Sequence, residues 1–292
     1  MALFGKLFGR RGDAHKDAKR EPGHQPVDAT MQFDGQGAAG DSEQMAEAVS
    51  QEELDPGEPV TIALPDGEQL EARAFYAADA MLDAPGILWL HGDDPTSGPS
   101  SRYAMARLMC QHRSCAVLVV DHPAGVVSCH AALQWLRDGA RRHGIATDQL
   151  FVGGTGPAAD LAVETALFER DQGGIALAYL MALYPSLGSG WDAGFSNVTR
   201  DKGLAGLPAA TVISGMGDPS CPDVTRFVER MRAAGVDVDF HMYRTALRGT
   251  GLEGSNPDVA QARTYVLRQL DEAVVQRRAP QPRVRRVDVP LV

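Results

Sequence analysis

Three kinds of side chain in this sequence could together carry out nucleophilic catalysis: a hydroxyl, a carboxylate and an imidazole. Thr155 lies in a glycine-rich stretch, residues 153–157, and Asp218 lies in Gly217-Asp218-Pro219. A hydroxyl becomes an effective nucleophile when a base takes its proton and a third group orients that base. The base would come from another loop, where the candidates are His91, His122 and His130. Such a constellation would attack a carbonyl carbon.

The stretch around Thr155 predicts a strand, a tight turn and a helix. An apolar run at 150–152 ends in glycines and is followed by an Ala-rich helical pattern with Pro157 in its first turn. Proline suits the first turn because its missing N–H would have no helical partner there and its φ already matches a helix. In an open α/β sheet such a turn lies at the carboxyl end of a central strand, where ligands bind.

The elements that must position these side chains alternate between strands and helices. A hairpin, 59–64 with 70–77 around Pro65-Asp66-Gly67, precedes this alternation. The βαβ spacing predicts an α/β fold with a mostly parallel sheet and helices on both faces. The predicted strands are 86–91, 115–120, 150–152, 176–183, 210–214 and 236–243, and the predicted helices are 103–112, 126–142, 157–170, 222–234 and 257–277.

The order of several short motifs is similar to that of a known family. They are His91-Gly92, the turn at 153–158, Arg170-Asp171-Gln172-Gly173-Gly174, Leu183-Tyr184-Pro185, Leu207-Pro208-Ala209, Gly217-Asp218-Pro219 and Ala233-Ala234-Gly235-Val236. Together they resemble the hormone-sensitive-lipase-like (carboxylesterase) branch of the α/β-hydrolase superfamily, over roughly residues 59–275. The resemblance implies an α/β-hydrolase fold. It also implies ester hydrolysis by Ser, acid and His in that chain order.

The nucleophile position of that family is altered in this chain. The resemblance matches Gly154-Thr155-Gly156-Pro157-Ala158 to the G-x-S-x-G turn, so Gly156 replaces the nucleophilic serine. Glycine has no oxygen, and it adopts the strained turn conformation without penalty. The following residue normally donates its N–H to the oxyanion, but here it is Pro157. Taking Thr155 as the nucleophile instead shifts this register by one residue and puts proline where the second glycine belongs.

The remaining catalytic positions are altered as well. The family's His-Gly-Gly-Gly oxyanion loop corresponds to His91, Gly92, Asp93 and Asp94. Asp218 matches the triad acid, with a turn residue that caps the helix near Pro222 as the alternative interpretation. Arg248 matches the catalytic histidine, and no histidine follows the last predicted strand. Arginine stays protonated and cannot act as a general base.

Two hypotheses about function follow. The first is a non-catalytic α/β-hydrolase-fold protein that binds a protein partner or a small acyl-type ligand. The alternative is an active ester hydrolase centred on Thr155 and Asp218. No cofactor or metal is predicted, because the candidate ligands Asp93, Asp94, Asp121 and His122 are most simply interpreted as solvated loop residues.

Composition divides the chain into three regions and excludes some partners. Residues 1–57 begin with cations and continue as an acidic linker; the predicted hydrolase-like domain spans 58–278, and residues 279–292 form an Arg- and Pro-containing tail. Low apolar content predicts disorder in the linker. The net charge of −10, without a basic stripe on the domain, argues against nucleic acid.

The expected location is the cytoplasm. Leu3, Phe4, Leu7 and Phe8 share a helical face, so residues 1–12 could touch a membrane surface weakly. The four cysteines, Cys110, Cys115, Cys129 and Cys221, lack CxxC spacing and are expected to be buried free thiols in a reducing compartment.

Overall fold

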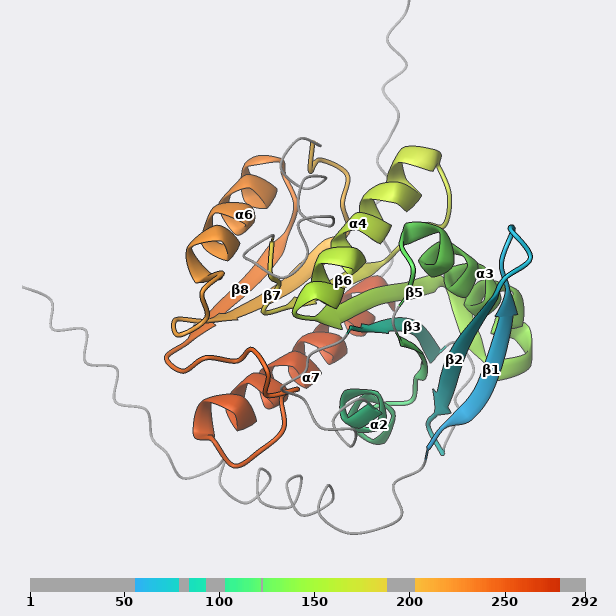
Figure 1. The fold of residues 1–292 in the computed structure, drawn as a ribbon, viewed down its shortest axis with the longest axis horizontal. Helices are drawn as coiled ribbons and strands as arrows, with labels where there is room; N and C mark the ends of the chain where they lie inside the picture. Colours follow the sequence, from blue (N-terminus) through green and yellow to red (C-terminus); the bar gives the residue numbers. More distant parts are fainter. Residues whose placement is uncertain (1–55, 79–83, 93–102, 122, 188–202, 279–292) are drawn as a thin grey trace, which may run out of the picture. The chain divides into compact units, whose positions relative to one another are not determined.

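The computed structural model describes residues 56–78, 84–92, 103–121, 123–187 and 203–278 (Figure 1). Several predicted features lie outside these residues: the basic start and acidic linker through residue 55, the tail after residue 278, and most of the loop before Leu204. Asp93, Asp94 and His122 also lie outside them.

The described strands form one sheet of eight strands in the order β1-β2-β4-β3-β5-β6-β7-β8. β3 to β8 run parallel, and the β1–β2 hairpin pairs antiparallel with β4. The mostly parallel sheet predicted from the alternating pattern is therefore confirmed. The strands are β1 Glu58–Ala63, β2 Gln69–Tyr76, β3 Ala84–His91, β4 Ala116–Asp121, β5 Ile145–Thr155, β6 Tyr179–Leu183, β7 Ala209–Gly215 and β8 Val238–Tyr243.

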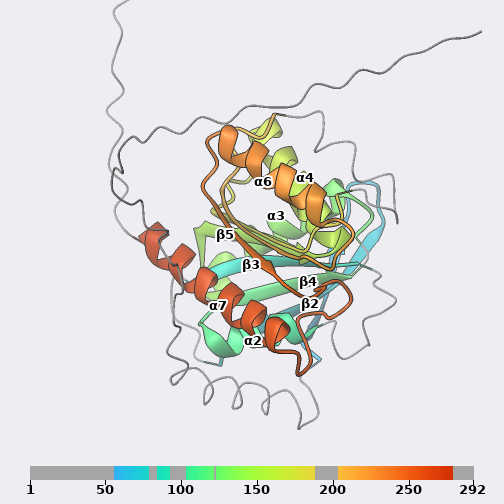
Figure 2. The same ribbon diagram turned by 90° about the vertical axis from the view of Figure 1, so that its left-hand side faces the viewer.

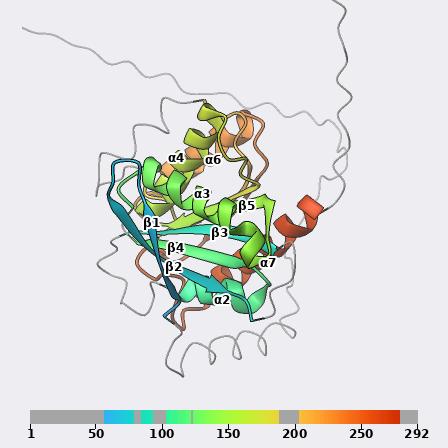
Figure 3. The same cartoon turned by 90° about the vertical axis from the view of Figure 1, so that its right-hand side faces the viewer.

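Helices cover both faces of this sheet, as predicted (Figures 2 and 3). One apolar cluster joins the sheet to α3 (Val126–His143), α4 (Pro157–Gln172) and α6 (Cys221–Ala233). A second cluster on the other face joins it to α2 (Ala104–His112) and α7 (Pro257–Arg278). The central strands β3 and β4 are buried on both faces, which explains their continuous apolar sequences.

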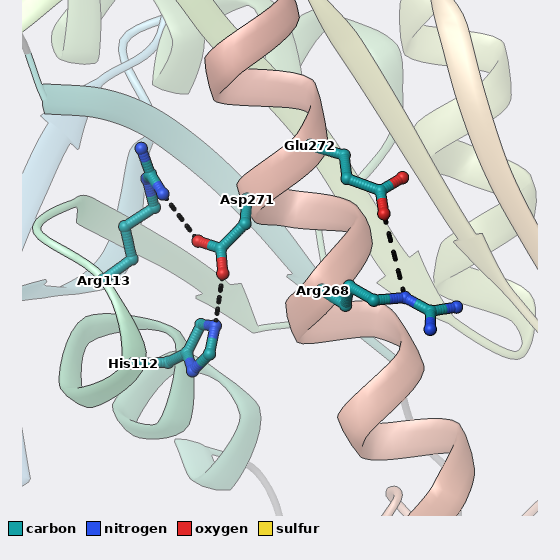
Figure 4. Close-up of polar contacts among 5 residues, drawn as sticks. All are labelled: His112, Arg113, Arg268, Asp271 and Glu272. Atoms are coloured by element: carbon teal, nitrogen blue, oxygen red, sulfur yellow. Dashed lines mark hydrogen bonds and ion pairs between the residues drawn. The ribbon is translucent and has the colours of Figure 1, made fainter.

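Ion pairs connect the two helices on the second face, beyond their apolar packing. The Asp271 carboxylate on α7 accepts a hydrogen bond from Arg113 Nη1 at 2.6 Å, and its other oxygen lies 2.8 Å from His112 Nε2 at the end of α2 (Figure 4). Arg268 and Glu272 form a longer pair on α7 itself, with 3.8 Å between Nε and Oε1. The last turn of α2 is thereby fixed against α7.

The central strand β5 begins earlier than predicted, at Ile145, and it also extends through Thr155 because its glycines lie inside the sheet. Gly153 pairs with Trp89 and Met181, and a Cβ on Gly153 would lie 2.8 Å from the Trp89 ring. A glycine in a strand often marks such close approach. The predicted strand 176–183 begins later, at Tyr179, and 236–243 begins at Val238.

The carboxyl ends of the parallel strands bring the predicted site residues to one edge. His91 ends β3, Thr155 ends β5, and Asp218 follows β7 by a short turn. In the described part of the chain, no helix is both long and apolar enough to cross a membrane.

Candidate functional site

Gly156 forms the sharp turn between β5 and α4. Its backbone has φ 55° and ψ −127°, a combination that residues with a side chain rarely adopt, and its N–H donates to the Leu183 carbonyl at 2.9 Å. Pro157 is the first helical residue, as predicted. The turn therefore keeps the geometry that would present a side chain from position 156, but that position carries only hydrogen.

There is room for a side chain at position 156. A Cβ built there would have the Tyr184 ring as its nearest neighbour, at 3.9 Å. Tyr184 itself is buried and has a positive φ of 41°, while its N–H donates to the Ile213 carbonyl. Packing does not exclude a larger residue at 156, so the glycine is not required by lack of space.

Gly154, in contrast, is required by close backbone approach. A Cβ there would lie 2.8 Å from the Ala158 carbonyl atoms and 2.9 Å from the Leu90 oxygen. We expect Gly154→Ala to lower the free energy of unfolding by about 1–3 kcal/mol, because rigid backbone must move. Gly203→Ala is the matched control, since open space surrounds Gly203. Urea unfolding measures both, and equal stability of the two variants would contradict this packing.

The loop after β3, whose residues are matched to the family's oxyanion loop, begins beside the start of α4. A Cβ on Gly92 would lie 3.7 Å from both the Cβ and the backbone nitrogen of Ala158. His91 is buried, and its strand neighbour in β4 is Asp121. Pro157 offers no N–H at this edge. The predicted oxyanion residues Asp93 and Asp94 are not described.

The Asp218 carboxylate binds backbone amides from two loops. Its Oδ2 accepts from the Gly215 N–H at 2.9 Å, and its Oδ1 accepts from the N–H groups of Leu247 and Arg248 at 3.1 and 3.0 Å. The side chain is 3% exposed. The alternative interpretation as a helix cap is wrong: α6 has Ser220 as its N-cap and no side-chain capping bond. Asp218 instead holds the loop after β8 against the loop after β7.

Arg248, the residue matched to the catalytic histidine, lies in that held loop. Its backbone N–H reaches Asp218, so position 248 adjoins the acid position. A second carboxylate fixes the same loop, because Asp258 accepts from the Thr245 N–H at 2.9 Å. The hydrogen bond from the Thr245 N–H is the largest cause of the lowered pKa of Asp258. Two carboxylates, Asp218 and Asp258, thus hold the loop that carries position 248.

His91 follows Leu90 at the end of β3, and Thr155 follows Gly154, the pairing partner of Leu90, at the end of β5, so His91 lies at the same strand ends as Thr155. His130 lies on α3, where its Nδ1 is 2.6 Å from Glu169 Oε1 and its Nε2 accepts from or donates to Gln134 at 2.9 Å. His241 lies on β8 and packs against the rings of Tyr243 and Tyr265.

The described side chains that could bind a metal ion do not cluster. No set of three or more His, Cys, Asp or Glu residues in those ranges has a metal-binding arrangement. Asp121, one of the residues weighed as a ligand, accepts a hydrogen bond from the Tyr103 hydroxyl at 2.8 Å. A small cavity lined by Asp237, Asp239 and Glu272 lies beside α7 at the amino ends of β7 and β8. Thr155 and Asp218 lie at the other, carboxyl ends of the parallel strands.

Sequence reasoning missed two features of the turn. It did not predict that Tyr184 would be the nearest neighbour of position 156, although the motif Leu183-Tyr184-Pro185 was noted. It also did not predict the bonds from Asp218 to residues 247 and 248, about thirty positions away. A short-range pattern carries no signal for such distant pairing.

Comparison with known proteins agrees with this architecture. Residues 88–196 match a family model described as alpha/beta hydrolase fold. The bacterial heroin esterase structure superposes with a TM-score of 0.66 at 17% identity, over 81% of this chain and 90% of that one. An esterase from Pyrobaculum calidifontis gives 0.68 at 17% identity, over 81% and 91% of the two chains. This chain is an α/β-hydrolase-fold protein.

A curated relative supports the predicted branch of this superfamily. Esterase LipI of Mycobacterium tuberculosis is 25% identical over 224 residues, which cover 62% of this chain and 70% of the relative. With the family match and the esterase structures, this confirms the resemblance to the hormone-sensitive-lipase-like carboxylesterases. In this chain, Gly156 and Arg248 occupy the positions that the resemblance matches to the nucleophile and the catalytic histidine.

Proposed function

We propose that this α/β-hydrolase-fold protein is a non-catalytic relative of the carboxylesterases. The observation that carries the proposal is Gly156, which has the conformation of a nucleophile-bearing turn and no atom that could attack a carbonyl. Removal of triad members leaves esterases and proteases with a residual of only about 10³–10⁴-fold over water. Loss of one oxyanion donor, here at Pro157, costs about 10²–10³ more.

The hydrogen bonds of Asp218 support the same proposal. In a working triad the acid orients an imidazole, but this carboxylate accepts from the amides of Gly215, Leu247 and Arg248. An arginine at 248 supplies a permanent cation in place of a base. Asp218 then has a structural role, and the loop it holds is available for binding instead of proton transfer.

Binding to a protein partner or to a small acyl-type ligand is the role we infer for the retained fold. Residues 21–58 carry ten carboxylates and no Lys or Arg. A partner that uses this region should be captured by the full chain and lost when residues 1–58 are removed. Equal capture by both forms would place the binding surface on the domain itself.

Turnover of short p-nitrophenyl esters tests the proposal. We expect the purified protein to release p-nitrophenol no faster than buffer, and we expect Thr155→Ala to change nothing. The alternative function, an ester hydrolase centred on Thr155 and Asp218, requires turnover that Thr155→Ala abolishes. Ser186→Ala, which removes a buried hydroxyl after β6, is the control for nonspecific effects of losing a hydroxyl.

A further inference from the structure

Two cysteines on the second face of the sheet lie close enough to react with each other. Cys110 is in the last turn of α2, and Cys115 immediately precedes β4. Their sulfur atoms are 3.8 Å apart, and the Cys110 thiol also points to the Cys115 carbonyl at 3.7 Å. Disulfide sulfurs are about 2.05 Å apart. The two side chains need to approach by only about 1.8 Å to bond.

The two thiols differ in access. Cys110 is partly exposed, whereas Cys115 is 3% exposed. The hydrogen bond to Cys110, together with burial, raises the pKa of the Cys115 thiol well above its usual value. Because Cys110 is the more accessible sulfur, a reagent in solution meets it first. Its proximity at 3.8 Å, and not its raised pKa, places the Cys115 sulfur for the second step of an exchange, in which it attacks its neighbour.

The backbone around the pair is fixed on both sides. Ala77 donates its N–H to the Cys115 carbonyl at 3.1 Å, and His112 and Arg113, between the two cysteines, both contact Asp271 on α7 (Figure 4). These contacts keep the sulfurs near each other in the reduced protein. The pair is a preformed dithiol, unlike Cys221, whose sulfur lies 3.8 Å from the Met242 thioether.

We propose that Cys110 and Cys115 form a reversible disulfide with each other, by exchange with low-molecular-weight disulfides. The Cys110 thiol loses its proton to solvent, and its thiolate attacks one sulfur of the small disulfide and releases one small thiol. The Cys115 thiol then loses its proton, its sulfur attacks the Cys110 sulfur, and the second small molecule departs as a thiolate that takes up a proton. The protein loses two hydrogens and two electrons, and the small disulfide becomes two thiols. This chemistry is independent of the proposed loss of esterase activity.

Intact mass after incubation with oxidised glutathione tests the proposal. The unaltered protein is expected to lose two hydrogens without retaining glutathione at this pair, and two of its four thiols should become resistant to alkylation. Excess dithiothreitol should restore all four. Proteolytic cleavage after Arg113 would leave the peptide with Cys110 joined by the disulfide to the peptide with Cys115. That second peptide also contains Cys129, so fragmentation is needed to show which of its two cysteines is bonded.

Two variants separate the steps. Cys115→Ala should keep a stable glutathione adduct on Cys110, because the displacing thiol is gone. Cys110→Ser should leave Cys115 unmodified, because it is buried. Any adduct at Cys221 should persist in every variant and serves as the internal control. A persistent adduct on Cys110 in the unaltered protein, or four alkylatable thiols after oxidation, would overturn the proposal.

Discussion

Ester hydrolysis is expected to appear when three residues are changed together: Gly156→Ser, Pro157→Ala and Arg248→His. The first change supplies the hydroxyl at a turn that has the required backbone and space for a Cβ. The last places an imidazole in a loop whose amide already reaches Asp218. Pro157→Ala supplies a backbone N–H for the oxyanion.

The contribution of each change can be ranked. Gly156→Ser alone should stay at the rate of the unaltered protein, because the arginine at position 248 cannot take a proton from the new hydroxyl. The triple variant should exceed the Gly156→Ser, Arg248→His pair by about 10²–10³-fold in kcat, the usual effect of one oxyanion donor. Steady-state kinetics with p-nitrophenyl butyrate measure these differences.

Gly156→Ala is the matched control for this series. It introduces the same Cβ and the same backbone strain of about 1–3 kcal/mol, but no hydroxyl. It should be inactive in every background. Activity of Gly156→Ser alone equal to that of the triple variant would mean that a base already exists near position 156, and the account of a lost triad would be wrong.

Asp218→Ala is expected to lower the free energy of unfolding by about 3 kcal/mol or more. Its buried carboxylate accepts hydrogen bonds from the amides of Gly215, Leu247 and Arg248. Each buried donor left without an acceptor costs about 1–3 kcal/mol. The change in urea midpoint at pH 7 measures the loss.

Asp258→Ala is the control for this loop. Asp258 also accepts from a loop amide, that of Thr245, but its side chain is only partly buried, so water can replace it more easily than at Asp218. A much smaller loss of stability is expected. If Asp218→Ala were no more destabilising than Asp258→Ala, the carboxylate would not be holding the two loops together.

The fold was largely predictable from the sequence because its signals are local. Apolar runs such as 115–120 and the Pro157 helix start depend on neighbouring residues, and alternating strands and helices imply a parallel sheet. The length of β5 was not predictable in this way. Its glycines are typical of a turn, and their place inside the strand depends on Trp89 and Leu90 in a neighbouring strand.

The site was predictable only in part. The match of the helix that follows predicted Gly156 at the turn between strand and helix, and the structure has Gly156 at that turn. The partners of Asp218 and the position of the Tyr184 ring depend on how three strand ends meet, which no short motif encodes. The separation of His130 from Thr155 has a similar cause, since His130 pairs with Glu169 across two helices.

Covalent labelling of the unaltered protein tests the lost nucleophile most directly. A p-nitrophenyl phosphonate transfers its phosphonyl group to an activated hydroxyl and releases p-nitrophenol, and both events are measurable by intact mass and absorbance. The account predicts an unchanged mass and release no faster than in buffer. One stoichiometric adduct, mapped to Thr155 or to any other hydroxyl at the carboxyl edge of the sheet, would contradict it.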